Sequence, residues 1–210
     1  YPRCCGMPQL ENGDLARVAA MAVQVAGEMK RWIADGYDVV SLVPSCSLMM
    51  KFEWPLIEPE NADVKRLARA TRDISEYIVD IAANEGLAGG LKPLKGGVGI
   101  HISCHARAQN MGRKGGEMLK LLPDTGVSVI ERCSGHGGAW GVMKDNFEVA
   151  LKVGKPAARQ ALKDNPAFIV SECPLARQHL IQGIERLGGE LAAVAEASHP
   201  IQLIARAYGL

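Results

Sequence analysis

The sequence contains no CxxC pair, no long apolar run and almost no net charge, and each absence excludes a class of protein. Without a CxxC pair, a zinc ribbon and a thioredoxin-like redox centre are disfavoured. No apolar run reaches the roughly 18 to 20 residues that span a bilayer, and the first residues do not resemble a signal peptide. A formal charge of +1 offers no electrostatic footprint for nucleic acid or an anionic membrane surface. We therefore expect a soluble protein that binds no nucleic acid and has no transmembrane segment.

The chain has 210 residues, of which 48% are hydrophobic, enough for one large domain or two small ones with buried cores. Its six cysteines could form disulfides in a secreted protein, but a chain this long and rich in aliphatic residues needs no such cross-links. We therefore expect a cytoplasmic protein whose cysteines are free or bound to metal.

A cysteine turn near the start opens the first of two parallel stretches. Cys4-Cys5-Gly6 is followed by apolar residues at helical spacing, which predict a helix over residues 14–34. The strand-like segment DVVSLV then leads to Cys46, which lies 42 positions after Cys4.

The second stretch has the same order of elements. Cys133-Ser134-Gly135 is followed by a helical pattern over residues 146–163, and strand-like AFIV leads to Cys173, 40 positions after Cys133. This agreement predicts two copies of one unit.

The second copy also has an upstream part. GVGIHIS predicts a strand ending at Cys104, a helix is expected over residues 106–122, and VSVIER predicts a strand ending at Cys133. The first copy has no counterpart of this part before Cys4. We therefore expect its N-terminal strand, cysteine and helix to be missing from this sequence.

Between the copies we expect a helix over residues 62–83 and a linker, EGLAGGLKPLKGG. The boundary near residue 92 gives domains 1–92 and 93–210, and a short helix closes the chain at residues 199–210. Strands that alternate with helices predict an α/β fold with parallel sheets flanked by helices. In such sheets the ligand crevice lies at the carboxyl ends of the strands, where the cysteines stand.

Cysteines at corresponding strand ends are better explained as metal ligands than as packing residues. Three thiolates and an imidazole suit tetrahedral zinc, and iron-sulfur clusters accept the same donors. His105 and His136 stand close in sequence to these cysteines and are the candidate imidazoles, whereas His101 and His179 are expected to be structural or exposed.

Glycines accompany both cysteine turns, and those in SGHGGAWG offer flexible backbone N–H groups. This run matches neither GxGxxG nor the phosphate loop, which disfavours a nucleotide. Close approach of the backbone to a bulky cofactor explains the glycines better. The cofactor-binding candidates are Gly6, Gly135, Gly137 and Gly138.

Five motifs, in the order CCGMPQ, PSCSLMMKFEWP, HISCH, CSGHGGAWG and SECPLA, resemble the cysteine-rich CCG-domain family. That family includes the C subunit of anaerobic glycerol-3-phosphate dehydrogenase and, more distantly, the B subunit of heterodisulfide reductase. The resemblance covers nearly the whole chain. It implies two CCG-type domains whose iron-sulfur clusters move electrons between a flavoprotein and a quinone or disulfide acceptor.

The resemblance makes Cys4, Cys5 and Cys46 ligands of a first cluster, with a further ligand expected from the missing upstream segment. That first site looks incomplete on this chain alone.

In the second copy, the resemblance makes Cys104, Cys133 and Cys173 ligands. Ser134 stands where the family's turn has a second cysteine, and Ala176 where a CxxC pair would end. His136 or His105 is the proposed fourth ligand.

The sequence therefore favours an iron-sulfur electron-transfer subunit, with a 4Fe-4S cluster as the expected cofactor and a flavoprotein dehydrogenase as the expected partner. Peripheral association with the cytoplasmic face of the inner membrane, through a complex, fits this role. A zinc-bound structural or interaction module is the first alternative, and a disulfide reductase acting at an iron-sulfur cluster is the second.

Overall fold

The computed structural model describes residues 2–189 and 197–210 and divides into two compact units. The first unit is Tyr1–Tyr77 and the second is Ile78–Leu210. The sequence places a domain boundary near residue 92, whereas these units divide between Tyr77 and Ile78, within a helix.

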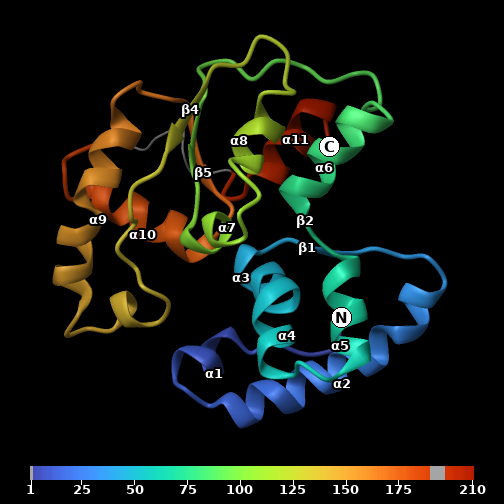
Figure 1. The fold of residues 1–210 in the computed structure, drawn as a ribbon. Coiled ribbons are helices and arrows are strands. Elements are labelled where there is room, and N and C mark those ends of the chain that lie inside the picture. The colour runs from blue at the N-terminus through green and yellow to red at the C-terminus, as the bar shows by residue number, and fades with distance from the viewer. Residues whose placement is uncertain (1, 190–196) are drawn as a thin grey trace. The chain divides into compact units, whose positions relative to one another are not determined.

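The second unit is built around a parallel sheet of three strands, with β3 (Val98–His101) in the centre. β4 (Val127–Ile130) and β5 (Phe168–Ser171) each pair with β3 in parallel, one on either side. The carboxyl ends of the three strands therefore lie at the same edge of the sheet (Figure 1). These strands confirm the three that the sequence predicts for this region.

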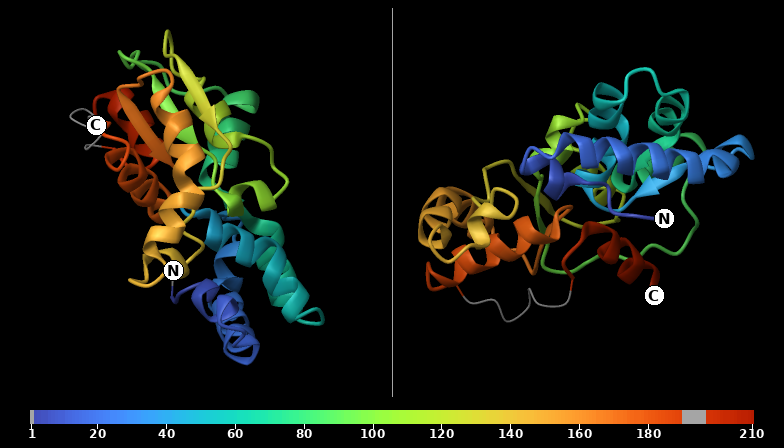
Figure 2. Two further views of the ribbon diagram at one scale, coloured as in Figure 1. Left: turned by 90° about the vertical axis from the view of Figure 1, so that its left-hand side faces the viewer. Right: turned by 90° about the horizontal axis from the view of Figure 1, so that it is seen from below.

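Helices cover both faces of this sheet, as Figures 1 and 2 show. Successive residues of a strand point to opposite faces. Ile169 of β5 packs in a core with α9 (Phe147–Leu162) and α10 (Pro174–Glu185). The next residue, Val170, packs in a second core with α8 (Lys114–Leu119) and α11 (Pro200–Tyr208). The unit is thus an α/β layer structure, as expected.

The helix expected over residues 106–122 is wrong, because the structure divides it. α7 (Cys104–Ala108) is followed by a loop, and only then does α8 begin. Asn110 and Gly112 of this loop have φ angles of 54° and 81°, in the left-handed region that a right-handed helix does not contain. Asparagine and glycine are the residue types that most readily adopt this conformation, so the sequence NMG is consistent with a break in the helix.

The first unit packs its helices around α2, whose buried face contributes to a core with Met49, Trp54 and Leu67. Two short parallel strands, β1 and β2, form its sheet. Its elements are α1 (Met7–Glu11), α2 (Leu15–Ala34), β1 (Val39–Ser41), α3 (Pro44–Leu48), a π-helical turn (Met49–Glu53), α4 (Trp54–Ile57), α5 (Ala62–Ala70), β2 (Thr71–Asp73) and the start of α6 (Ile74–Asn84).

The single helix expected over residues 62–83 is also wrong, because β2 interrupts it between α5 and α6. Pairing with β1 satisfies backbone groups of both strands, which outweighs continuing the helix. Asp73 then starts α6: its side chain accepts from Ser75 N, and Glu76 reaches back to Asp73 N. These N-terminal capping contacts are visible in the sequence DISE.

The remaining expected helices are present. α2 begins after Asp14, whose side chain caps Arg17 N, and α9 and α11 lie where the helical patterns place them. Among the described residues, no helix is both long enough and apolar enough to cross a bilayer.

Candidate metal centre

The two cysteine turns have the same local geometry. Gly6 and Gly135 have φ angles of 84° and 88°, which a residue with a side chain rarely adopts. Each glycine N–H donates to the sulfur two residues before it: Gly6 N to Cys4 Sγ at 3.5 Å, and Gly135 N to Cys133 Sγ at 3.3 Å. The glycine therefore folds the backbone around the first sulfur of each turn.

The turn of the second unit lies directly against α9. A Cβ at Gly135 would overlap the carbonyl oxygen of Ala150 and lie 2.8 Å from Gly154 N. A Cβ at Gly154 would in turn overlap the carbonyl oxygen of Ser134. Backbone packs on backbone here, so α9 fixes the position of the turn that carries Cys133.

The three cysteines of the second unit follow its three strands at the carboxyl edge of the sheet. Cys104 is the first residue of α7, whose N-cap Ser103 accepts from Ala106 N. Cys133 follows β4 and is exposed, and Cys173 is the buried N-cap residue of α10. All the described cysteines are free thiols, as ligand cysteines must be.

His136 is the imidazole that the structure brings to a cysteine. Its Nε2 lies 4.0 Å from Cys173 Sγ, and its Nδ1 lies 3.2 Å from the carbonyl oxygen of Gly138. A carbonyl oxygen only accepts, so Nδ1 carries the hydrogen and Nε2 presents its lone pair towards the sulfur. A histidine oriented through its other ring nitrogen is typical of metal sites.

Opposing influences act on Cys173. The pKa of its thiol is raised, chiefly by burial and also by the charge of Glu172, although the N–H groups of Ala176 and Leu175 at the start of α10 act to lower it. Positive charge from a bound metal would favour the thiolate of this buried group.

Two other predicted ligands of this unit, Cys104 and His105, lie on α7. His105 is half-buried on α7, next in sequence to Cys104. The guanidinium of Arg107 lies 3.5 Å from Cys104 Sγ. In the part of the chain described, no three or more histidine, cysteine or acidic side chains meet closely enough to hold a metal ion. Cys173 and His136 form a donor pair whose Sγ and Nε2 atoms lie 4.0 Å apart.

Glycines of the loop after Cys133 also adopt positive φ angles. Gly137 and Gly138 have φ angles of 52° and 60°, and Gly141 N donates to His136 O at 2.7 Å. A Cβ at Gly141 would overlap that same carbonyl oxygen. The loop thus closes tightly behind His136 and fixes its backbone.

In the first unit, Cys5 and Cys46 form a hydrogen-bonded pair. This contact and burial raise the pKa of the Cys5 thiol, and the same hydrogen bond lowers the pKa of Cys46 against the opposing effect of burial. Cys4 also interacts with Cys5. The indole of Trp54 donates to the carbonyl oxygen of Cys5 at 3.0 Å in the core, which fixes the turn from below. The sequence offers no signal for this last contact.

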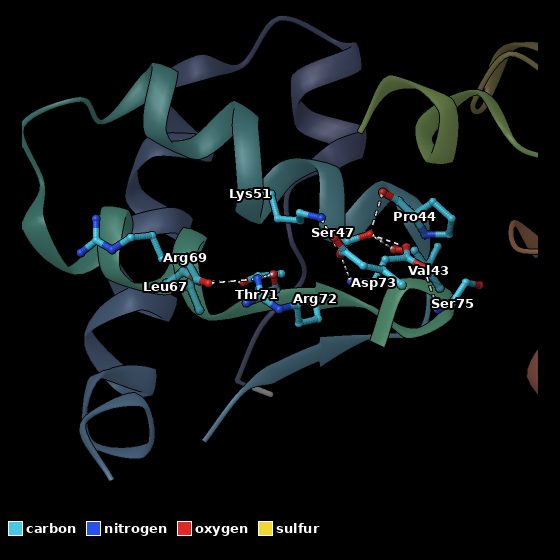
Figure 3. Close-up of polar contacts among 11 residues, drawn as sticks. Val43, Pro44, Ser47, Lys51, Leu67, Arg69, Thr71, Arg72, Asp73 and Ser75 are labelled. Atoms are coloured by element: carbon cyan, nitrogen blue, oxygen red, sulfur yellow. Dashed lines mark hydrogen bonds and ion pairs between the residues drawn. The ribbon is translucent and has the colours of Figure 1, made fainter. Parts of the chain in front are cut away.

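The helix that carries Cys46 is anchored by a buried carboxylate (Figure 3). Ser47 Oγ donates to Asp73 Oδ2 at 2.8 Å, and the other oxygen, Oδ1, accepts from Ser75 N at 3.0 Å. Asp73 ends β2 and Ser47 lies on α3, so this contact joins the strand to the cysteine-bearing helix.

The later cysteines of the two units stand at different positions in matching local structures. β1 and β5 both end in a serine whose Oγ accepts the N–H two residues on, at Val43 and Cys173. Each of these residues is an N-cap in extended conformation followed by proline. By this match Cys173 corresponds to Val43, and Cys46 corresponds to Ala176. Cys46 therefore lies three residues after the N-cap of its helix, whereas Cys173 is itself the N-cap.

Comparison with known proteins agrees with the sequence motifs. Residues 98–180 match the model of the cysteine-rich domain family CCG. The chain is 25% identical to the C subunit of anaerobic glycerol-3-phosphate dehydrogenase from Escherichia coli strain K12 over 207 residues, which are 98% of this chain and 49% of that protein. The resemblance to CCG-domain proteins is thereby confirmed.

Two archaeal relatives carry other names. The B subunit of fumarate reductase (CoM/CoB) from Methanothermobacter marburgensis is 27% identical over 88% of this chain and 35% of that protein. The D subunit of dihydromethanophenazine:CoB–CoM heterodisulfide reductase from Methanosarcina barkeri is 24% identical over 99% of this chain and 50% of that protein. The chain spans about half the length, or less, of these relatives.

Proposed function

We propose that this chain is an iron-sulfur electron-transfer subunit, or part of one, in a larger oxidoreductase. The observation that carries the proposal is that three cysteines follow the carboxyl ends of the three strands of the second unit, where His136 Nε2 lies 4.0 Å from Cys173 Sγ. Thiolates with an imidazole are donors that iron-sulfur clusters accept. Three of the relatives are named as subunits of a dehydrogenase or a reductase, which supports a role within a complex.

In the second unit, the proposed ligands are Cys104, Cys133, Cys173 and His136, with a 4Fe-4S cluster as the expected cofactor. The residues fit such a group, because the donors are soft and free and the loop glycines let the backbone approach a bulky body. A bound cluster would supply one-electron transfer at a potential set by its surroundings. His136 takes precedence over His105, since its ring is oriented by Gly138.

The chain's own groups would set those surroundings. Backbone N–H groups lie beside Cys133 and Cys173, and the guanidinium of Arg107 lies beside Cys104. Hydrogen bonds to ligand sulfur stabilise negative charge there and raise the reduction potential of a cluster.

We also propose that the two units are copies of one domain. The matched glycine turns, the strand-end serines and the N-caps followed by proline support this. Matching contacts at the starts of α6 and α11 add to it: Glu76 accepts from Asp73 N, as Gln202 accepts from His199 N. In the first unit, the proposed ligands are Cys4, Cys5 and Cys46.

The proposed partner is a flavoprotein dehydrogenase, and the proposed acceptor is a quinone or a disulfide. With a quinone acceptor, electron transfer would take place at the cytoplasmic face of the inner membrane. Other members of the complex, rather than this chain, would provide the membrane association. Reduction of a disulfide at the cluster itself is the second candidate.

Anaerobic reconstitution with ferrous iron and sulfide tests the proposal. We expect visible absorption that bleaches on reduction, and loss of the second unit's contribution to it in the variants C133S and C173S. Substitution of Met143 by leucine, an exposed change in the same loop region, provides the matched control and should leave the absorption unchanged. Uptake of zinc alone, with no iron chromophore under any condition, would instead support a zinc-bound structural module.

A further inference from the structure

His101 occupies a position from which a side chain of the central strand reaches both flanking cysteine loops. It is the last residue of β3, and its register partners are Ile130 of β4 and Ser171 of β5. Cys133 follows Ile130 closely along the chain, and Cys173 follows Ser171. The imidazole therefore lies where the chain leaves the sheet towards both cysteines.

Both ring nitrogens of His101 are used. Nε2 lies 2.9 Å from the carbonyl oxygen of Arg132, and Nδ1 lies 3.1 Å from Ser171 Oγ. The carbonyl oxygen only accepts, so Nε2 carries the hydrogen. In the neutral ring Nδ1 is then an acceptor, and the Ser171 hydroxyl donates to it.

The serine continues the chain of hydrogen bonds to the second loop. Ser171 Oγ accepts from Cys173 N at 3.3 Å while its hydroxyl hydrogen serves His101. Three hydrogen bonds thus connect Cys173 N–H to the Ser171 hydroxyl, the Ser171 hydroxyl to His101, and His101 to the carbonyl of Arg132. That carbonyl belongs to the peptide bond that joins Arg132 to Cys133. This series of hydrogen bonds thus begins and ends on peptide groups of two proposed ligands, Cys173 and Cys133.

We propose that His101 is a positioning residue, which holds the Cys133 and Cys173 loops at a fixed separation so that both sulfurs can bind one metal centre. The inference rests on the proposed function, because it presumes that these cysteines act together. It gives His101 a role that neither the motifs nor the ligand set assigns.

Burial makes this bridge hard to replace. His101 and Ser171 are 1% and 0% exposed, so water does not replace a lost partner at the Ser171 hydroxyl. A buried hydroxyl left unpaired is costly, and the Cys173 loop would shift to relieve it. Partners that orient metal ligands from behind change metal affinity by roughly 10- to 100-fold when they are removed.

The test uses the 210-residue chain without metal, titrated anaerobically with Co²⁺, whose absorption reports thiolate ligation. The variant H101F keeps an aromatic ring and removes both nitrogens. The variant S171A removes the hydroxyl that joins His101 to Cys173 N. We expect each to weaken Co²⁺ binding roughly 10- to 100-fold. Because the two residues act through the same series of hydrogen bonds, the double variant should lose little more Co²⁺ affinity than either single variant.

A matched control separates positioning from stability. Leu122 is buried near the amino end of β4, away from the cysteine edge, so L122A destabilises the unit without touching the bridge. Its Co²⁺ affinity should equal that of the unsubstituted chain. Nitrogen NMR of the metal-free chain should place the His101 hydrogen on Nε2, and S171A should shift the Nδ1 resonance.

Full Co²⁺ affinity in folded H101F and S171A would overturn the inference, as would additive losses in the double variant. An unsubstituted chain that binds no Co²⁺ would also overturn it. A chain that shows the Co²⁺ effects but takes up no iron would support the bridge and reject the proposed iron-sulfur function. If H101F fails to fold, S171A carries the test alone.

Discussion

Substitution of Gly135 by alanine tests how the turn of the second unit is held. The φ angle of 88° costs a residue with a side chain roughly 1–2 kcal/mol. The new Cβ would also overlap the carbonyl oxygen of Ala150, and overpacking of this kind costs typically about 1–3 kcal/mol. We expect G135A to lower the free energy of unfolding by about 2–5 kcal/mol.

The control for backbone strain is Gly188, whose φ angle is 75° and whose Cβ would meet nothing within 4 Å. G188A should therefore cost only the conformational part, roughly 1–2 kcal/mol. Urea denaturation followed by circular dichroism measures both variants. Equal losses for G135A and G188A would refute the close packing of the turn on α9.

Gly154 provides a test by sign. In a free helix, alanine in place of glycine stabilises by about 1 kcal/mol. Exposed Gly27 of α2 has open space around it, and G27A should follow that rule. At Gly154 the methyl group would overlap the carbonyl oxygen of Ser134, so G154A should destabilise and weaken metal binding. A stabilised G154A variant would contradict the account.

Three further predictions concern other contacts. S47A leaves the buried Asp73 carboxylate without this donor and should cost about 1.5–3 kcal/mol by urea denaturation, and an unchanged midpoint would refute this contact. C133S should abolish iron binding in the second unit while circular dichroism stays unchanged. Burial lowers the pKa of His101 and His179 below the ordinary value of 6.5. As the pH drops through about 6.5, these histidines therefore take up protons in the unfolded state before they do so in the folded state. The free energy of unfolding should fall over this pH range. Thermal denaturation of the metal-free chain at about pH 8 and about pH 5 checks this sign.

The sequence predicts the strands and long helices of the second unit because their patterns are local. Hydrophobic residues in AFIV or at helical spacing in residues 146–163 depend on no distant partner. β2 escapes prediction because Thr71–Asp73 is polar and becomes a strand only through pairing with β1. The division of the helix at Asn110 is not predicted by hydrophobic spacing, although its turn residues are visible in the sequence.

The site divides in the same way. Cysteines, glycines and His136 stand out by type and repetition, so the sequence selects them as candidates. The role of His101 depends on the register of β3 with β5, and the Trp54 contact depends on how a helix packs under Cys5. The offset between Cys46 and Cys173 follows from the strand-end serine, which motif spacing alone does not locate.

The most direct test of the central claim is the iron and acid-labile sulfide content of the chain purified without oxygen. The account predicts iron and sulfide in comparable amounts, both lowered together in C173S. Zinc without iron, or an iron content that C173S and C133S both leave undiminished, would contradict it.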